Sequence, residues 1–147
     1  MSIILLGLNY KSAPVEIREK VSMSKSNIKR NLEFLQQMES VDGIAVLSTC
    51  NRTEFYMDAR DGSKAVKGLM KFISWYSKCP TELLEQHMYV KREREAVEHL
   101  FTVAAGLDSM ILGESQIQGQ VQDAYNYAYQ LSTYVLVFSP LLCLINV

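Results

Sequence analysis

The sequence contains few of the residues that build metal sites and disulfide frameworks. Its 147 residues include three cysteines and two histidines, and no two cysteines have the CxxC spacing. A structural zinc site needs four clustered Cys or His ligands, and small secreted domains pair an even number of cysteines. We therefore expect no metal site, and free thiols in a cytoplasmic protein.

Two longer signals are also missing. None of the seven glycines is separated from another by one residue, so the chain has no GxGxxG turn for a dinucleotide. No apolar run reaches the about 20 residues that span a membrane, and the uncharged segment 134–147 is interrupted by Pro140. We expect a domain over residues 1–131, a divergent apolar tail over 132–147, and no membrane association.

The charges of the chain are almost balanced. Fifteen Lys and Arg residues face sixteen Asp and Glu residues, which gives a formal net charge of -1. The overall basic field of a DNA-binding protein is therefore absent, and we expect no DNA partner. Two local basic groups have two interpretations each, a solvated surface or a contact with phosphates: Lys64, Lys67 and Lys71, and Lys91, Arg92 and Arg94.

Hydrophobic periodicity predicts a domain of mixed helices and strands. Apolar runs and alternating patterns indicate strands over residues 2–8, 44–47, 53–58 and 87–91. Apolar stripes indicate helices over residues 26–39, 63–77, 92–106 and from Gly113 to about 131. The order β-α-β-β-α-β followed by two helices predicts an α+β fold, the ferredoxin-like split βαβ sandwich.

Three local features refine this prediction. Pro14 should prevent a helix in residues 9–24, which leaves a loop before a helix capped by Ser24 or Ser26. The alternation over residues 53–58 predicts a strand with one exposed face. The short link from Ser48 to Arg52 predicts a tight turn that projects Cys50 at the end of the sheet.

Cys50 is the first candidate for chemistry. It lies in a polar turn two residues from Arg52, whose charge would stabilise a thiolate, although a lone cysteine is also compatible with a structural role. His99 borders an apolar helical stripe and is either packed there or a general base. Asp108 and Ser115 are residue types suited to helix capping.

Three blocks of sequence are long and specific. They are GLNYKSAP over residues 7–14 with Arg18 and Glu19, LSTCNRTE over 47–54, and AAGLDSMILGESQI over 104–117 with Gly119 to Val121. Together they resemble the N-terminal catalytic domain of glutamyl-tRNA reductase, the first enzyme of the five-carbon route to tetrapyrroles. The resemblance spans about residues 3–131, and Tyr10 stands where that family usually has histidine.

The resemblance implies a reaction and a set of site residues. The Cys50 thiolate attacks the ester of glutamyl-tRNA and forms a glutamyl thioester, from which hydride from NADPH releases glutamate-1-semialdehyde. His99 matches a histidine important for activity, and we expect it to assist proton movement. The positions that match substrate-binding residues are Thr49, Asn51, Arg52, Ser109, Glu114, Ser115, Gln116 and Gln120. Among them, the Arg52 guanidinium suits a carboxylate.

The resemblance also concerns parts that this sequence does not contain. The family's NADPH-binding domain and its dimerisation helices are missing, so we expect thioester formation here without reduction or a bound cofactor. Handover of the product to glutamate-1-semialdehyde aminomutase is a further implied partner relation. The alternative is a non-catalytic module of the same fold that binds tRNA or a partner. The intact block from Thr49 to Arg52 counts against that alternative.

Overall fold

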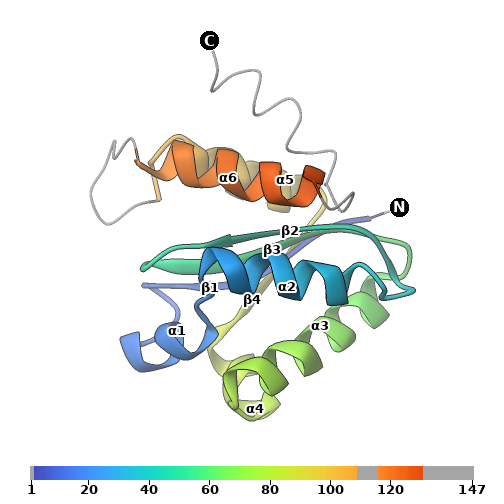
Figure 1. Ribbon diagram of the computed structural model, residues 1–147. Coiled ribbons are helices and arrows are strands. Elements are labelled where there is room, and N and C mark those ends of the chain that lie inside the picture. The colour runs from blue at the N-terminus through green and yellow to red at the C-terminus, as the bar shows by residue number, and fades with distance from the viewer. Residues whose placement is uncertain (1, 109–115, 131–147) are drawn as a thin grey trace.

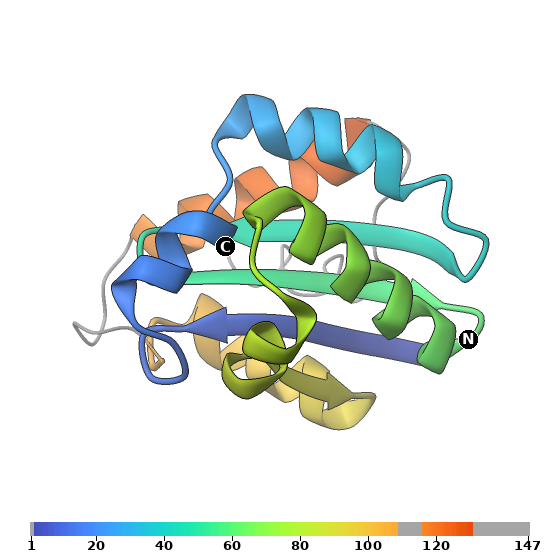
Figure 2. The same ribbon diagram turned by 90° about the horizontal axis from the view of Figure 1, so that it is seen from below.

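The computed structural model describes residues 2–108 and 116–130. In chain order its elements are β1 (Ser2–Asn9), α1 (Val15–Val21), α2 (Lys25–Leu35), β2 (Val41–Ser48), β3 (Arg52–Ala59), α3 (Gly62–Ser77), α4 (Thr81–His87), β4 (Tyr89–Arg92), α5 (Arg94–Ala104) and α6 (Gln116–Gln130). The sheet separates α5 and α6, above it in Figure 1, from α1 to α4 below it. The view from below shows these four helices lying across the sheet (Figure 2).

All four strands form one antiparallel sheet in the order β2-β3-β1-β4. β2 and β3 form a hairpin, and β1 lies between β3 and β4. Each β-α-β unit therefore has a strand of the other unit between its own two strands, which is the split βαβ arrangement. The predicted α+β class, the ferredoxin-like order and the two following helices are confirmed.

The segment predicted as a loop contains a short helix, so that prediction was wrong. Pro14 does not interrupt this helix but stands at its N-cap position, with α1 beginning at Val15. A proline is tolerated at a helix start because the first N–H groups have no intrahelical acceptor there. Ile17 and Val21 then face the core on one side of α1.

The predicted exposed face of β3 is also wrong, because all eight residues of this strand are buried. The side chains do alternate as the sequence indicates. Phe55 and Met57 join the core beneath the sheet, whereas Tyr56 joins the core above it. Helices α5 and α6 cover the upper face, and this coverage turns Glu54 into a buried carboxylate with 0% exposure.

Helix boundaries follow from local chemistry. Ser24 is the N-cap of α2, and its Oγ accepts a hydrogen bond from the backbone N–H of Asn27 at 3.3 Å. On α5, Leu100 and Ala104 are buried, whereas Val97 and Phe101 are only partly buried. The buried apolar stripe of α6 consists of Ile117, Val121, Ala124 and Ala128.

Gly7 lies at the centre of the sheet, between the two residues that meet above it. The register pairs Gly7 with Glu54 of β3 on one side and with Tyr89 of β4 on the other. Residues directly opposite each other on neighbouring strands share a face of the sheet. A Cβ on Gly7 would lie 2.9 Å from Cγ of Glu54 and 3.0 Å from the backbone oxygen of Thr53. The missing side chain is therefore what allows Glu54 and Tyr89 to approach each other.

We predict that Gly7→Ala destabilises the domain by about 1–3 kcal/mol, because the added methyl overpacks a closed site. Urea unfolding followed by circular dichroism measures this change. Gly119→Ala is the matched control, since a Cβ there meets nothing within 4 Å. In the interior of α6 that change should stabilise by about 0.5–1 kcal/mol. Equal effects of the two substitutions would contradict the packing argument.

Candidate active site

The turn that carries Cys50 is held by its neighbour Thr49. The backbone N–H of Thr49 donates to the carbonyl of Arg52 at 2.8 Å, which closes the β2–β3 hairpin. The Thr49 Oγ1 accepts from the backbone N–H groups of Asn51 and Arg52 at 3.1 and 3.2 Å. Such hydroxyl-to-backbone bonds fix a turn locally. Cys50 is exposed at the tip of this turn, as the sequence predicts.

A small cleft surrounds this turn. It is lined by residues of the turn and of the first two turns of α6: Thr49, Cys50, Asn51, Arg52, Gln116, Ile117 and Gln120. Five of the eight predicted substrate-binding residues therefore share one cleft with the candidate nucleophile. The other three, Ser109, Glu114 and Ser115, lie outside the described residues.

The buried carboxylate of Glu54 is the centre of the polar network behind the turn. Its Oε1 accepts a hydrogen bond from the hydroxyl of Tyr56 at 3.0 Å. Its Oε2 accepts one from the hydroxyl of Tyr89 at 2.6 Å and lies 2.5 Å from Nε2 of His99. The Nη1 of Arg52 lies 3.6 Å from the same oxygen. Four side chains thus satisfy a carboxylate that would be very unfavourable if buried alone.

Arg52 connects Glu54 to a second carboxylate, that of Asp108. The Nη1 of Arg52 donates to Oδ2 of Asp108 at 3.0 Å, and Nη2 donates to the Asp108 backbone oxygen at 2.5 Å. Lys11 donates to Oδ1 of Asp108 at 3.1 Å. The side chain of Arg52 is only 2% exposed, so its guanidinium holds the turn, β3 and the end of the α5 segment together.

The network shifts the pKa values of its members. Burial acts to lower the pKa of Arg52, but the charges of Glu54 and Asp108 outweigh it and raise the value. Burial acts to raise the pKa of Asp108, but hydrogen bonds from Lys11 and Arg52 outweigh it and lower the value. Burial and the neighbouring Glu54 carboxylate raise the pKa of Tyr89. The two ion-paired groups therefore remain charged, and the phenol remains neutral, over the physiological pH range.

His99 does not line the Cys50 cleft. It lies on α5 and lines a neighbouring cleft together with Tyr89 and Asp108. Its side chain is 12% exposed, and its ring lies 5.6 Å from that of Tyr89 between centroids. His99 reaches the turn through Glu54 and Arg52, in a chain of contacts that the sequence did not indicate.

The sequence pattern missed four residues of this network. No sequence pattern marks Tyr56 or Tyr89, the alternation over residues 53–58 is compatible with an exposed Glu54, and Asp108 is of a type suited to helix capping. In the structure the Asp108 carboxylate pairs with Arg52 and Lys11, and its capping role stays a prediction. One usable signal was present: Glu54 interrupts a strongly apolar strand, and an acidic residue in such a strand needs a buried partner.

Residues 2–108 and 116–130 hold no group of three or more His, Cys, Asp or Glu side chains that could bind a metal ion. Within those ranges no helix is both long and apolar enough to cross a membrane. Cys79 is buried in the lower core, and Cys143 lies outside the described residues.

Comparison with known proteins gives the family. The family model described as Glutamyl-tRNAGlu reductase, N-terminal domain, matches residues 6–142. The chain belongs to this family. Glutamyl-tRNA reductase of Brevibacillus brevis is 43% identical over 141 residues, which cover 96% of this chain and 31% of the relative. The enzyme of Geobacter sulfurreducens is 38% identical over 142 residues, with 97% and 33% covered.

A solved structure agrees with this assignment. Glutamyl-tRNA reductase from Methanopyrus kandleri superposes with a TM-score of 0.74 at 30% identity, and the match covers 98% of this chain and 33% of that one. The chain thus spans about a third of the length of the relatives that it matches. The predicted resemblance and the predicted fold are both confirmed.

The lowered pKa of Asp108 predicts a pH dependence of stability. Because its folded pKa lies below the unfolded value of about 3.9, Asp108 stabilises the fold above that pH, and this contribution disappears as the pH falls further. Urea midpoints measured from pH 6 to 2 should therefore fall more steeply for the wild type than for Asp108→Asn. Asp61→Asn is the control, because asparagine also caps α3. Identical pH profiles of wild type and Asp108→Asn would contradict the assignment.

Proposed function

We propose that this domain transfers the glutamyl group of glutamyl-tRNA to Cys50 as the first half of the glutamyl-tRNA reductase reaction. The observation that carries the proposal is the cleft in which exposed Cys50 lies beside Thr49, Asn51, Gln116 and Gln120. A nucleophile surrounded by hydroxyl and amide groups is suited to orienting a small polar acyl group. Family membership supports the same assignment.

The proposed step exchanges an ester for a thioester. The Cys50 thiolate attacks the carbonyl carbon that joins glutamate to the terminal ribose, and a C–S bond forms. The tetrahedral intermediate collapses with cleavage of the C–O bond, and the released ribose oxygen takes up a proton. The thiol proton is lost to solvent when the thiolate forms, so charge and protons balance. Hydroxyl and amide groups of Thr49, Asn51, Gln116 and Gln120 orient the glutamyl group.

Arg52 acts in this proposal mainly by positioning the turn. Its guanidinium already binds Asp108 and lies beside Glu54. Its predicted contact with a substrate carboxylate stays a prediction. Ser109, Glu114 and Ser115 remain predicted substrate residues, and we propose that Glu114 pairs with the ammonium group of the substrate. His99 is proposed to hold the Glu54 carboxylate in place. Its predicted part in proton movement stays a prediction.

Reduction of the thioester is assigned to no residue of this chain. NADPH supplies a hydride in the family's reaction, but the sequence has no GxGxxG turn to hold its pyrophosphate. The described residues therefore do not fit that cofactor. We propose that the glutamyl thioester on Cys50 is the product of this domain by itself.

Intact-mass spectrometry tests the proposal. After incubation with glutamyl-tRNA, the chain should gain the mass of one glutamyl group, and hydroxylamine should remove it, as expected for a thioester. Cys50→Ser should show no adduct, whereas Cys79→Ala should retain it because Cys79 is buried away from the cleft. An adduct on Cys50→Ser, or none on the wild type, would reject Cys50 as the acceptor.

A further inference from the structure

A second cleft adjoins the one that contains Cys50. It has a volume of about 310 Å³ and is lined by Asn9, Lys11, Ser12, Tyr89, Lys91, His99 and Asp108. Arg52 connects the two, because it lines the Cys50 cleft and bonds to Asp108 on the wall of the second cleft.

The second cleft is built to keep two ammonium groups at its rim. Asn9 holds the loop of Lys11, since its Oδ1 accepts from the backbone N–H groups of Lys11 and Ser12 at 3.0 and 3.1 Å. His87 fixes the same loop through the Ser12 carbonyl at 2.9 Å. Lys91 projects from β4 two residues after Tyr89 and so on the same face of the sheet.

Aromatic rings accompany both ammonium groups. The Lys11 Nζ lies 5.6 Å from the ring centroid of Tyr10, and the Lys91 Nζ lies 5.8 Å from that of Tyr89. Sites for single-stranded nucleic acids combine a positively charged groove with aromatic side chains, because ammonium groups contact the phosphates and rings can stack on bases.

Each of the two lysines has one acidic partner that a phosphate would replace, Asp108 for Lys11 and Glu95 for Lys91. Asp108 is bound by Arg52 as well as by Lys11, and Glu54 is buried and satisfied by its own donors. The partner of Lys91 is Glu95, at 3.4 Å with 65% of its side chain exposed. An exposed pair of this kind is worth only about 0–1 kcal/mol, so a phosphate can replace it.

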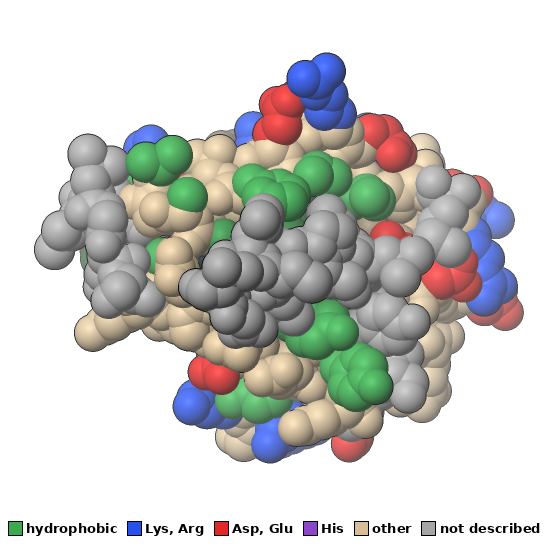
Figure 3. Space-filling view, turned by 90° about the horizontal axis from the view of Figure 1, so that it is seen from above, with side chains coloured by type: hydrophobic (Ala, Val, Ile, Leu, Met, Phe, Trp, Pro, Cys, Tyr) green, Lys and Arg blue, Asp and Glu red, His purple; other side chains and the backbone are tan. Residues whose placement is uncertain are grey.

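We infer that the cleft between Lys11 and Lys91 binds phosphodiester groups of the single-stranded acceptor end of the RNA that carries the glutamyl group. This inference rests on the proposed function, because the substrate's ester places its RNA next to Cys50. Two local lysines are compatible with a net charge of -1 for the whole chain. In the view onto the side of the sheet that carries α5 and α6, the visible Lys and Arg side chains lie around the outline of the molecule (Figure 3).

The test is RNA binding as a function of salt. The probe is a fluorescent single-stranded RNA that ends in CCA, titrated with the 147-residue chain from about 25 to 200 mM NaCl and followed by anisotropy. Each phosphate contact on a single strand contributes about 0.7 to the slope of log K against log salt. The double variant K11A/K91A should therefore lower the slope by about 1.4.

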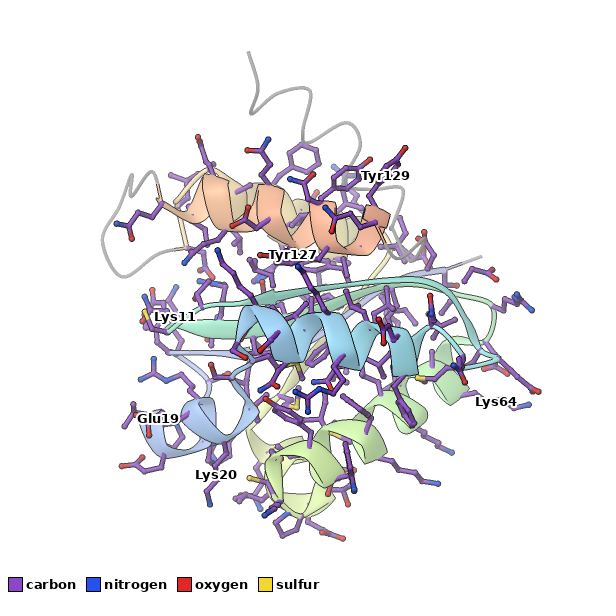
Figure 4. All side chains as sticks on the ribbon, viewed as in Figure 1. Lys11, Glu19, Lys20, Lys64, Tyr127 and Tyr129 are labelled. Atoms are coloured by element: carbon purple, nitrogen blue, oxygen red, sulfur yellow. The ribbon has the colours of Figure 1, made fainter. Side chains whose placement is uncertain are left out.

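The matched control is K64A/K67A, which removes the same amount of charge. Lys64 and Lys67 are exposed on α3, and Figure 4 shows Lys64 at the opposite end of the molecule from Lys11. This control should leave the slope unchanged. Inorganic phosphate, titrated as a competitor, should displace the RNA only at a phosphate concentration much higher than that of the RNA.

Four results would overturn the inference. They are no RNA binding by the wild type, an unchanged slope in K11A/K91A, an equal loss of slope in K64A/K67A, and equal competition by inorganic phosphate. The mass adduct on Cys50 distinguishes a failure of the RNA-binding inference from a failure of the proposed acyl transfer. An adduct with an unchanged salt slope rejects the cleft alone, whereas RNA binding without an adduct rejects the acyl transfer.

Discussion

A single buried carboxylate, that of Glu54, holds the site together. A charge with 0% exposure is stable in a domain only when donors surround it, and here the donors come from β3, β4 and α5. Because Arg52 is one of these neighbours, the turn that carries Cys50 is tied to the interior of the domain. The position of an exposed thiol therefore depends on an interaction that lies beneath it, and not on the residues of its own loop alone.

This arrangement explains why the split βαβ topology suits the site. It places β1 between β3 and β4, with Gly7 of β1 opposite both Glu54 and Tyr89. Because Gly7 has no side chain, the side chains of Glu54 and Tyr89 meet above it. A side chain at Gly7 would fill that space. The helices α5 and α6 then cover the network, and α6 also supplies Gln116 and Gln120 to the cleft. The order of the strands thus determines which side chains meet at the site.

The sequence predicted the fold class, the strand order and the exposed position of Cys50, because periodicity and a short link report local structure. It did not predict α1, since a proline at a helix start looks the same in sequence as a proline that breaks a helix. It also did not predict that Glu54 is buried. Alternation shows which residues share a face of a strand, but not whether later helices cover that face. The pairing of Asp108 with Arg52, 56 residues away, has no local signal at all.

The most direct test of this account compares two rates at Cys50 in Glu54→Gln. The substitution keeps the shape of the side chain but removes the charge beside Arg52. Transfer of the glutamyl group from glutamyl-tRNA should slow by about 10- to 100-fold, as misplacement of a positioned group does. Alkylation of Cys50 by iodoacetamide should stay unchanged, and Glu98→Gln, on an exposed part of α5, should alter neither rate. Transfer at the wild-type rate in Glu54→Gln would contradict the account.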